Sequence, residues 1–260
     1  MIDRQQLEKL LDDHRQRRLS LWWNSWASPT HKYLYVAVGK AACTKIKLSL
    51  HQLEGYPPLA DGSLVHDRNR PGGPFVPALT DFTNAQAFEI LTSPEWFRFC
   101  FVRNPFYRLF SAYKSKMLNY GDAQYQPVRD EIRARWHYPL RDGRPAGMVA
   151  FRDFVRYVEQ QADTERDFHW RLQTTIVMPA LIKYDFIGRI ESFAQDFGQV
   201  LKRFNASAEL MAAIPQPVNQ TTQIYHAAAY DQELADRVYD MYQEDFTNFG
   251  YERDSWLFDY

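Results

Sequence analysis

The chain has few cysteines, almost no net charge and no long hydrophobic run. Its 2 cysteines, Cys43 and Cys100, each lie in an apolar segment, which favours two buried thiols over a structural disulfide. A formal net charge of −1 removes the general attraction of basic proteins to nucleic acid, so any anion site must be local. No apolar stretch approaches the roughly 20 residues that cross a bilayer, and the N-terminus is too polar for a secretory signal. The cytoplasm is therefore the expected location.

The 260 residues are enough for a large buried core. Hydrophobic residues make up 45% of the chain and aromatic residues 16%, which is typical of a folded globular protein. The length fits one large domain or two small ones, and of these we expect a single domain over 1–260. Its first part, 1–30, is expected to hold an amphipathic helix and then a tryptophan-rich segment that packs on the domain, with contact to a membrane as the alternative. The charged, turn-rich stretch 119–148 indicates a surface insertion, within which 128–137 could be helical.

Apolar runs of strand length alternate with helical patterns along the chain. Strands are expected at 33–38, 97–102 and 181–190, the last of them buried. Helices are expected at 43–54, near 84–91, and at 105–118, 151–158, 193–201 and 232–246. This alternation predicts an α/β domain with a central, mostly parallel sheet flanked by helices. In such folds the ligand lies at the carboxyl ends of the strands.

The first strand leads into a corner that could bind an anion. The apolar run breaks at Gly39 and reopens as a helix, with Lys40, Thr44 and Lys45 around the turn. Free backbone N–H groups and the helix dipole favour an anion at such a helix start, and Gly39 can adopt a turn closed to other residues. The segment is not a Walker A motif, which needs G-x-x-x-x-G-K-[ST]. An ordinary strand–helix turn is therefore the alternative to a phosphate site.

The strand at 97–102 leads into a similar corner. Arg103 ends the strand, and Pro105 marks the first helical turn, where its missing N–H would be unpaired anyway. A guanidinium is costly to bury without an anionic partner, and it can bind two phosphate oxygens at once. Ser111 lies about two turns into the helix and can help only if the ligand lies along it. The alternative is an arginine paired with an internal carboxylate. Two such corners in one domain suggest a ligand with two anionic groups.

Four segments of the chain occur in the order of a known family. They are Lys40-Ala-Ala-Cys43-Thr44-Lys45-Ile-Lys47, similar to P-K-x-G-C-T-N-W-K; residues 103–113, similar to R-[DE]-P-F-x-R-L-x-S-A-[YF]; residues 168–171 with 184–191, similar to H-W and Y-D-[FL]-[VI]-G-x-x-E; and residues 238–251, similar to L-Y-x-x-Y-x-x-D-F-x-x-F-x-Y. Through these segments, which are spread over nearly the whole chain, it resembles the carbohydrate sulfotransferases of the chondroitin/dermatan 4-O- and HNK-1 type.

The resemblance implies a P-loop-like nucleotide-binding fold and 3′-phosphoadenosine 5′-phosphosulfate (PAPS) as co-substrate, without a metal. In the family the first segment binds the 5′-phosphosulfate and the second binds the 3′-phosphate. The implied donor-binding residues are Lys40, Ala41, Ala42, Cys43, Thr44, Lys45, Arg103 and Ser111. Lys40 would meet the charge that grows on the leaving phosphate. Ala42 replaces a family glycine and would hinder close approach of the backbone to the sulfate. The missing cysteine pair and membrane anchor of the Golgi members imply a soluble, bacterial-type enzyme.

The acceptor hydroxyl needs a base near neutral pH, and histidine is suited to this task. Among the 7 histidines, His66 lies between the two donor segments and is the first candidate, with Asp67 orienting it. Glu191 is an outside candidate, placed beside the acceptor. A structural histidine is the alternative for His66.

The H-W segment suggests residues that contact the acceptor. His169, Trp170 and Arg171 could line the acceptor groove, because an indole face and a guanidinium suit sugar rings and anionic saccharides. A structural histidine is again the alternative for His169.

The expected function is transfer of the sulfuryl group of PAPS to a hydroxyl of a carbohydrate or glycoconjugate. Within this class, a small alcohol, a phenol or a lipid is the alternative acceptor. Outside it, the alternatives are a nucleotide-dependent kinase, which the missing Walker A motif disfavours, and a non-catalytic anion-binding relative, which Gly39 and Ala42 suggest. We find no metal-ligand spacing and expect no nucleic-acid partner. The sequence identifies neither the acceptor nor the oligomeric state.

Overall fold

The computed structural model describes residues 24–67, 76–141, 143–214 and 228–258, together with Gln5, Lys9 and Asp12. The helix expected at the N-terminus, apart from those three residues, and the indoles of Trp22 and Trp23 lie outside the described residues. The chain divides into two compact units: unit 1 comprises Met1–Val102 and Gln173–Val218, and unit 2 comprises Arg103–Leu172 and Asn219–Tyr260. The single domain expected over 1–260 stays a prediction.

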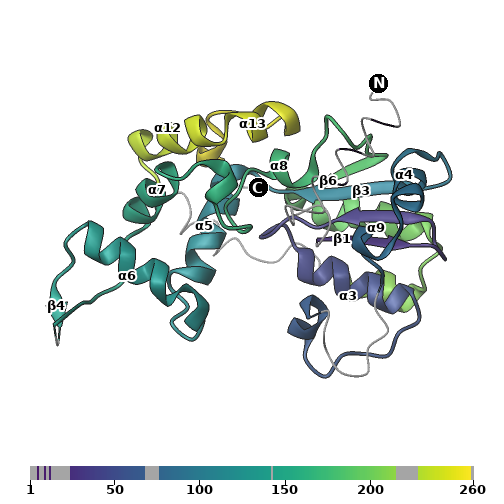
Figure 1. Ribbon diagram of the computed structural model, residues 1–260, viewed down its shortest axis with the longest axis horizontal. Helices are drawn as coiled ribbons and strands as arrows, with labels where there is room; N and C mark the ends of the chain where they lie inside the picture. The colour runs from purple at the N-terminus through teal and green to yellow at the C-terminus, as the bar shows by residue number, and fades with distance from the viewer. Residues whose placement is uncertain are drawn as a thin grey trace. The chain divides into compact units, whose positions relative to one another are not determined.

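Unit 1 is built on a 4-stranded sheet of order β1-β2-β3-β6 (Figure 1). The strands are β1 (Ser25–Ser28), β2 (Tyr33–Val36), β3 (Phe97–Val102) and β6 (Phe186–Arg189). β2 pairs parallel with β3 and β3 pairs parallel with β6, whereas β1 is antiparallel to β2. The mostly parallel sheet expected from the sequence is confirmed. Strand β1 was not expected, because it lies in the tryptophan-rich segment; there Trp26 is buried in the core.

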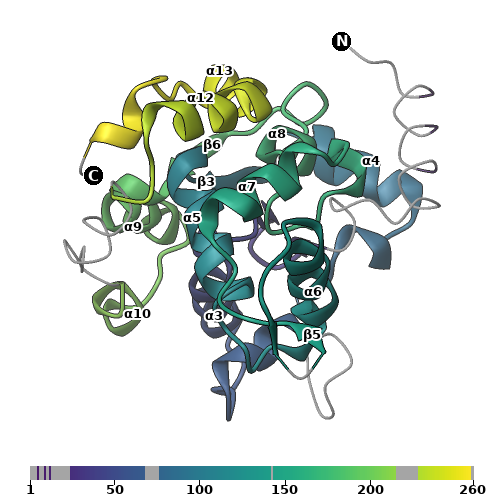
Figure 2. The ribbon, with the colours of Figure 1, turned by 90° about the vertical axis from the view of Figure 1, so that its left-hand side faces the viewer.

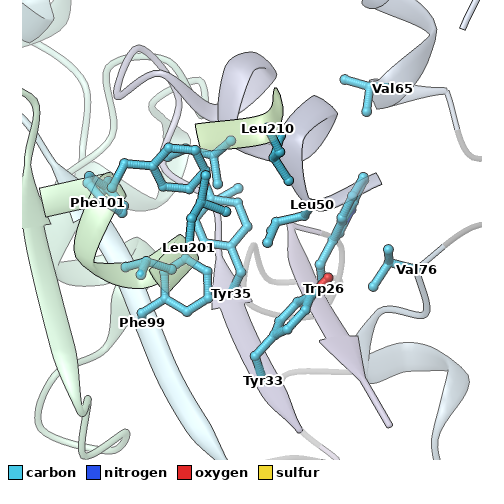
Figure 3. Close-up of a cluster of buried hydrophobic side chains, with 14 of the residues drawn as sticks. Trp26, Tyr33, Tyr35, Leu50, Val65, Val76, Phe99, Phe101, Leu201 and Leu210 are labelled. Carbon is cyan, nitrogen blue, oxygen red and sulfur yellow. The ribbon is translucent and has the colours of Figure 1, made fainter. Parts of the chain in front are cut away.

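Aromatic side chains of the central strands form the core of unit 1 on one face of the sheet. Tyr33 and Tyr35 of β2 lie beside Phe99 and Phe101 of β3 (Figure 3). Three helices cover this face: α3 (Cys43–Leu53), α9 (Phe193–Arg203) and α10 (Ala208–Ala212). The opposite face is covered by α4 (Asn84–Thr92), since Arg98, which alternates with these aromatics along β3, donates to the carbonyl of Leu91. Helices thus flank the sheet on both faces, as expected.

The strand expected at 181–190 is shorter and less buried than the sequence suggested. Only the four residues of β6 pair with β3, at the edge of the sheet, and Ile187 is 38% exposed. Before it, the carboxylate of Asp185 accepts hydrogen bonds from the backbone N–H and the Nε of Arg98 at 2.8 and 3.0 Å. Within β6, a Cβ at Gly188 would lie 2.4 Å from the ring of Phe101. Asp185 and Gly188 of this segment therefore allow β6 to pack closely against β3.

Unit 2 is helical. Its helices are α5 (Pro105–Lys116), α6 (Gln126–Arg135), α7 (Phe151–Glu159), α12 (Gln232–Met241) and α13 (Gln243–Phe249). In Figure 2, α5, α6 and α7 lie side by side, with α12 packed against α5 and α7. The single helix expected at 232–246 is wrong: the helix is interrupted at Tyr242, whose hydroxyl donates to the carbonyl of Trp170. Tyr242 is thus buried at the break between α12 and α13.

The stretch 119–148 is not merely a surface insertion. It contains α6 and a small hairpin of β4 (Leu140–Arg141) and β5 (Arg144–Pro145). The side chain of Arg129 in α6 is fully buried at 0% exposure, and its guanidinium donates to the carbonyls of Lys116 and Asp122 at 2.7 and 2.8 Å. Because these carbonyls belong to the end of α5 and the turn after it, the stretch is an integral part of unit 2. The helix considered at 128–137 is confirmed with earlier bounds.

Candidate functional site

The corner after β2 is shaped by two residues with left-handed backbone. Lys40 has a φ of 67° and Ala42 a φ of 54°. From the sequence, Gly39 was expected to adopt the backbone conformation that is closed to other residues. That expectation is wrong, because the residues with positive φ at this corner are Lys40 and Ala42. Ala42 is the N-cap residue of α3 and provides no side-chain hydrogen bond to the helix start. Ala42 thus takes the conformation that suits the family's glycine, and its methyl group does not prevent that backbone path.

The side chains at this corner carry the functional groups of an anion site. Lys40 and Lys45 are half-buried, while Thr44 is exposed one residue after the start of α3. Cys43 is half-buried and Ala41 is fully buried. The helix start has no acidic residue in its first turn and no cap from a side chain, so the positive end of its dipole is not neutralised by the helix's own residues. This arrangement suits a phosphate or sulfate oxygen.

Thr44 and His66 meet although 22 residues separate them. The hydroxyl oxygen of Thr44 lies 2.7 Å from the Nε2 of His66. His66 is the last residue of a short 3₁₀ helix, η1 (Gly62–His66), whose N-cap Asp61 accepts from the N–H of Ser63. Asp67 follows and is exposed. The structure therefore brings the predicted base next to a predicted donor-binding residue within unit 1.

The corner after β3 begins unit 2. Arg103 is half-buried and follows directly on Val102, the last residue of β3. The next residue, Asn104, is fully buried; its side-chain oxygen caps α5 by accepting from the N–H of Phe106 at 3.0 Å, and its Nδ2 donates to Ser255 at 2.8 Å. Asparagine directly before proline is a sequence signal for such a cap, although Asn104 was not among the residues expected at the site. Ser111 is half-buried in the second turn of the same helix.

The second arginine of the same motif is structural. Arg108 is 1% exposed, and its guanidinium donates to the carbonyls of Arg171 and Phe168 at 2.6 and 3.1 Å. These backbone acceptors flank His169. The motif therefore contains two arginines with different positions. Arg103 lies at the corner after β3, and Arg108 is hydrogen-bonded to the backbone of the H-W segment.

His169 belongs to a hydrogen-bonded cluster with Asp167 and Tyr125. Its Nδ1 lies 2.7 Å from a carboxylate oxygen of Asp167 and 3.0 Å from the hydroxyl of Tyr125. A carboxylate only accepts, so Nδ1 carries the hydrogen. Burial raises the pKa of Asp167, but hydrogen bonds from the side chain and backbone of His169 outweigh it, so the pKa stays below its usual value. Burial and the charge of Asp167 raise the pKa of Tyr125. With 27% of its side chain exposed, His169 is oriented and accessible to solvent.

Two other residues predicted to line an acceptor groove have internal roles. Trp170 is 2% exposed, donates to Gln161 and packs edge-on against Phe154, so its indole face is not open to a sugar ring within unit 2. The guanidinium of Arg171 donates to the carbonyls of Asp163, Thr164 and Arg166. The expectation for Trp170 is therefore wrong, because its neighbours enclose it.

The predicted site residues fall on both units. Unit 1 holds Lys40, Ala41, Ala42, Cys43, Thr44, Lys45, His66, Asp67 and Glu191, and unit 2 holds Arg103, Ser111, His169, Trp170 and Arg171. Glu191 is half-buried in a short 3₁₀ helix after β6. In the part of the chain that the structure describes, no group of three or more histidine, cysteine, aspartate or glutamate side chains is placed to hold a metal ion. In the same part, no helix is both long and apolar enough to cross a bilayer.

Comparison with known proteins adds independent findings. A family model described as "Sulfotransferase family" matches residues 23–252. Among curated relatives, carbohydrate sulfotransferase 14 of Danio rerio is 28% identical over 240 residues, covering 90% of this chain and 64% of the relative. Carbohydrate sulfotransferase 10 of Danio rerio is 28% identical, covering 87% of this chain and 66% of the relative. Human carbohydrate sulfotransferase 14 is 27% identical, covering 90% and 62%. The chain thus spans just under two thirds of these relatives. No solved structure matches significantly.

Proposed function

Because the chain belongs to the sulfotransferase family, we propose that it transfers the sulfuryl group of PAPS to a hydroxyl of a carbohydrate or glycoconjugate acceptor. The observation that carries the proposal is the corner at Lys40 and Thr44, where a helix start without a side-chain cap has cationic and hydroxyl residues beside it in the chain. The family match spans this corner and the one at Arg103. The relatives named above are carbohydrate sulfotransferases, which supports a saccharide acceptor.

The donor-binding residues in this proposal belong to the two corners. The 5′-phosphosulfate would be bound by the loop and helix start of unit 1, through Thr44, Lys45 and the backbone from Lys40 to Cys43. The left-handed backbone at Ala42 supports this assignment, since it matches the position of the family's glycine. The 3′-phosphate would be bound by Arg103 and Ser111 of unit 2, because a guanidinium can bind two oxygens of one phosphate.

The chemical step needs charge stabilisation more than covalent help from the protein. Lys40 would stabilise the negative charge that develops on the leaving phosphate. His66 would accept the proton of the attacking hydroxyl, and its contact with Thr44 at 2.7 Å supports a place beside the donor. His169, oriented by Asp167, would contribute to binding of the acceptor.

Calorimetry with 3′-phosphoadenosine 5′-phosphate (PAP) tests donor binding directly. We expect PAP to bind the intact protein and the Arg103→Ala variant to bind at least about tenfold more weakly, since an arginine–phosphate pair contributes roughly 1.5–3 kcal/mol. Arg253→Ala is the matched control, because Arg253 is an exposed arginine of the same unit that pairs with Asp236. Failure of the intact protein to bind PAP would reject the proposal.

A transfer assay with labelled PAPS tests the acceptor class. Saccharides are compared with phenols and alkyl alcohols at equal concentration, and label is expected in the saccharides. Label confined to phenols or alcohols would reject the carbohydrate acceptor while leaving the donor assignment intact. The cytoplasmic location expected from the sequence stays a prediction, which fractionation of the source cells would test.

A further inference from the structure

The contact between Thr44 and His66 is held by two packed elements of unit 1. Helix η1, which ends at His66, packs on α3: Val65 is buried in the same core cluster as Leu50 of α3. Gly62 lies so close to α3 that an added Cβ would be 3.2 Å from Leu48. This packing holds the backbones of Thr44 and His66 close together, so that their side chains reach a separation of 2.7 Å between Thr44 Oγ1 and His66 Nε2.

The hydrogen in this contact has two possible positions. The Thr44 hydroxyl has one hydrogen to donate and can also accept, while a neutral imidazole carries its hydrogen on one of two nitrogens. When Thr44 donates to Nε2, His66 carries its hydrogen on Nδ1. When Thr44 donates elsewhere, its oxygen can only accept from His66, and Nε2 must then carry the hydrogen. A phosphate oxygen at Thr44 is a charged acceptor and is the stronger competitor for the hydroxyl hydrogen.

We propose that Thr44 is a positioning residue that couples occupancy of the donor site to the tautomer of His66. With the 5′-phosphate bound, the hydroxyl of Thr44 donates to the phosphate and accepts from Nε2–H of His66. The lone pair of His66 then lies on Nδ1, the ring nitrogen turned away from Thr44. This inference rests on the proposed function, because it requires a phosphate group at Thr44. Its consequence is that the two states of the donor site favour different tautomers of His66.

Nuclear magnetic resonance of the imidazole nitrogens, with and without PAP, tests the coupling. Two other histidines of the chain are internal references. His51 donates from Nε2 to the carbonyl of Pro57 at 2.9 Å, so it is an Nε2–H imidazole, whereas His169 faces a carboxylate with Nδ1. The His66 signal is assigned by its loss in His66→Gln. We expect saturating PAP to move the His66 pattern toward that of His51, while both references stay unchanged.

Two variants of Thr44 distinguish the effect of its hydroxyl group from the effect of the side chain's shape. Thr44→Val keeps the branched side chain but cannot donate or accept. PAP is expected to bind this variant more weakly and, at concentrations that saturate it, not to shift the His66 tautomer. Thr44→Ser restores the hydroxyl and is expected to restore the shift. Thr44 is exposed, so neither change disturbs the core.

The outcomes distinguish this inference from the function on which it rests. If calorimetry shows PAP binding and His66 keeps one tautomer throughout, the coupling is wrong and the proposed function stands. If the shift persists in Thr44→Val, another group causes it and the role of Thr44 is wrong. If PAP does not bind the intact protein at all, the proposed function fails first, and the coupling fails with it.

Discussion

The buried guanidinium of Arg108 donates a 2.6 Å hydrogen bond to the backbone carbonyl of Arg171, 63 residues further along the chain. Arg108 lies in the segment that resembles a phosphate-binding motif, yet its partners are carbonyls that flank His169. Two arginines five residues apart therefore have different roles: Arg103 lies at the corner after β3, and Arg108 supports the H-W segment.

Arg108→Lys is expected to lower the free energy of unfolding by about 2–3 kcal/mol, because an ammonium cannot replace the forked guanidinium at both carbonyls and one hydrogen bond to a charged donor is lost. Urea unfolding followed by tryptophan fluorescence measures this. Arg103→Lys is the matched control and is expected to weaken PAP binding with little change in stability. A variant at Arg108 that kept full stability while losing PAP affinity would contradict the structural role.

Ala42→Gly is expected to raise the free energy of unfolding by about 0.5–1 kcal/mol. A left-handed conformation costs a non-glycine residue roughly 1–2 kcal/mol, and the added freedom of glycine in the unfolded chain offsets about 0.4–1 kcal/mol of that. Ala41→Gly is the control, since Ala41 is buried beside it without a positive φ and should lose stability. Equal destabilisation of both variants in thermal unfolding would show that the left-handed backbone at Ala42 carries no strain.

Gly188→Ala is expected to destabilise the protein by about 1–3 kcal/mol through overpacking, because the new Cβ would lie 2.4 Å from the ring of Phe101. Gly198→Ala in α9 is the counterpart: the nearest atom is 3.8 Å away, and alanine is favoured in helices, so a gain of roughly 0.5–1 kcal/mol is expected. Chemical denaturation of the two variants compares them. If Gly188→Ala were as stable as the parent, the close packing of Gly188 against Phe101 would not limit stability, contrary to this prediction.

The pKa of Asp167 predicts a pH dependence of stability. The value is lowered in the folded state, where burial raises it but hydrogen bonds from His169 outweigh that effect. The contribution of Asp167 is therefore present above its unfolded value of about 3.9 and is lost as the pH falls through the lower folded value. The difference in unfolding free energy between the parent and Asp167→Asn should shrink as the pH falls from 5 to about 3. A difference that stayed constant over this range would contradict the assignment.

Lys40→Asn is expected to lower the rate of sulfuryl transfer by about 10²–10³-fold, the range found when one donor to a developing charge is removed. Asparagine tolerates the left-handed backbone that Lys40 adopts with its φ of 67°, so the change removes the charge without adding strain. Lys183→Asn, at an exposed lysine of the same unit, is the control and should transfer at the parent rate. Unchanged transfer in Lys40→Asn would remove Lys40 from the mechanism.

The sequence by itself determined the local features of this protein. The strand at 97–102, the start of α5 at Pro105 and the helices at α3 and α7 follow from hydrophobic periodicity and from residues that begin helices. The strand–helix corners at Lys40 and Arg103 were readable for the same reason, because each depends on a few consecutive residues. The mostly parallel sheet followed from their order along the chain.

Tertiary structure decided what depends on segments that are distant in sequence. The burial of Trp170, the interruption of the last helix at Tyr242 and the contact of Thr44 with His66 join residues between 9 and 72 positions apart. Periodicity reports which face of an element is apolar, but it does not say which element covers that face or which polar group a buried donor meets. These partners are decided by the tertiary structure, because each buried polar group must find its hydrogen-bond partner among the groups that the fold places beside it.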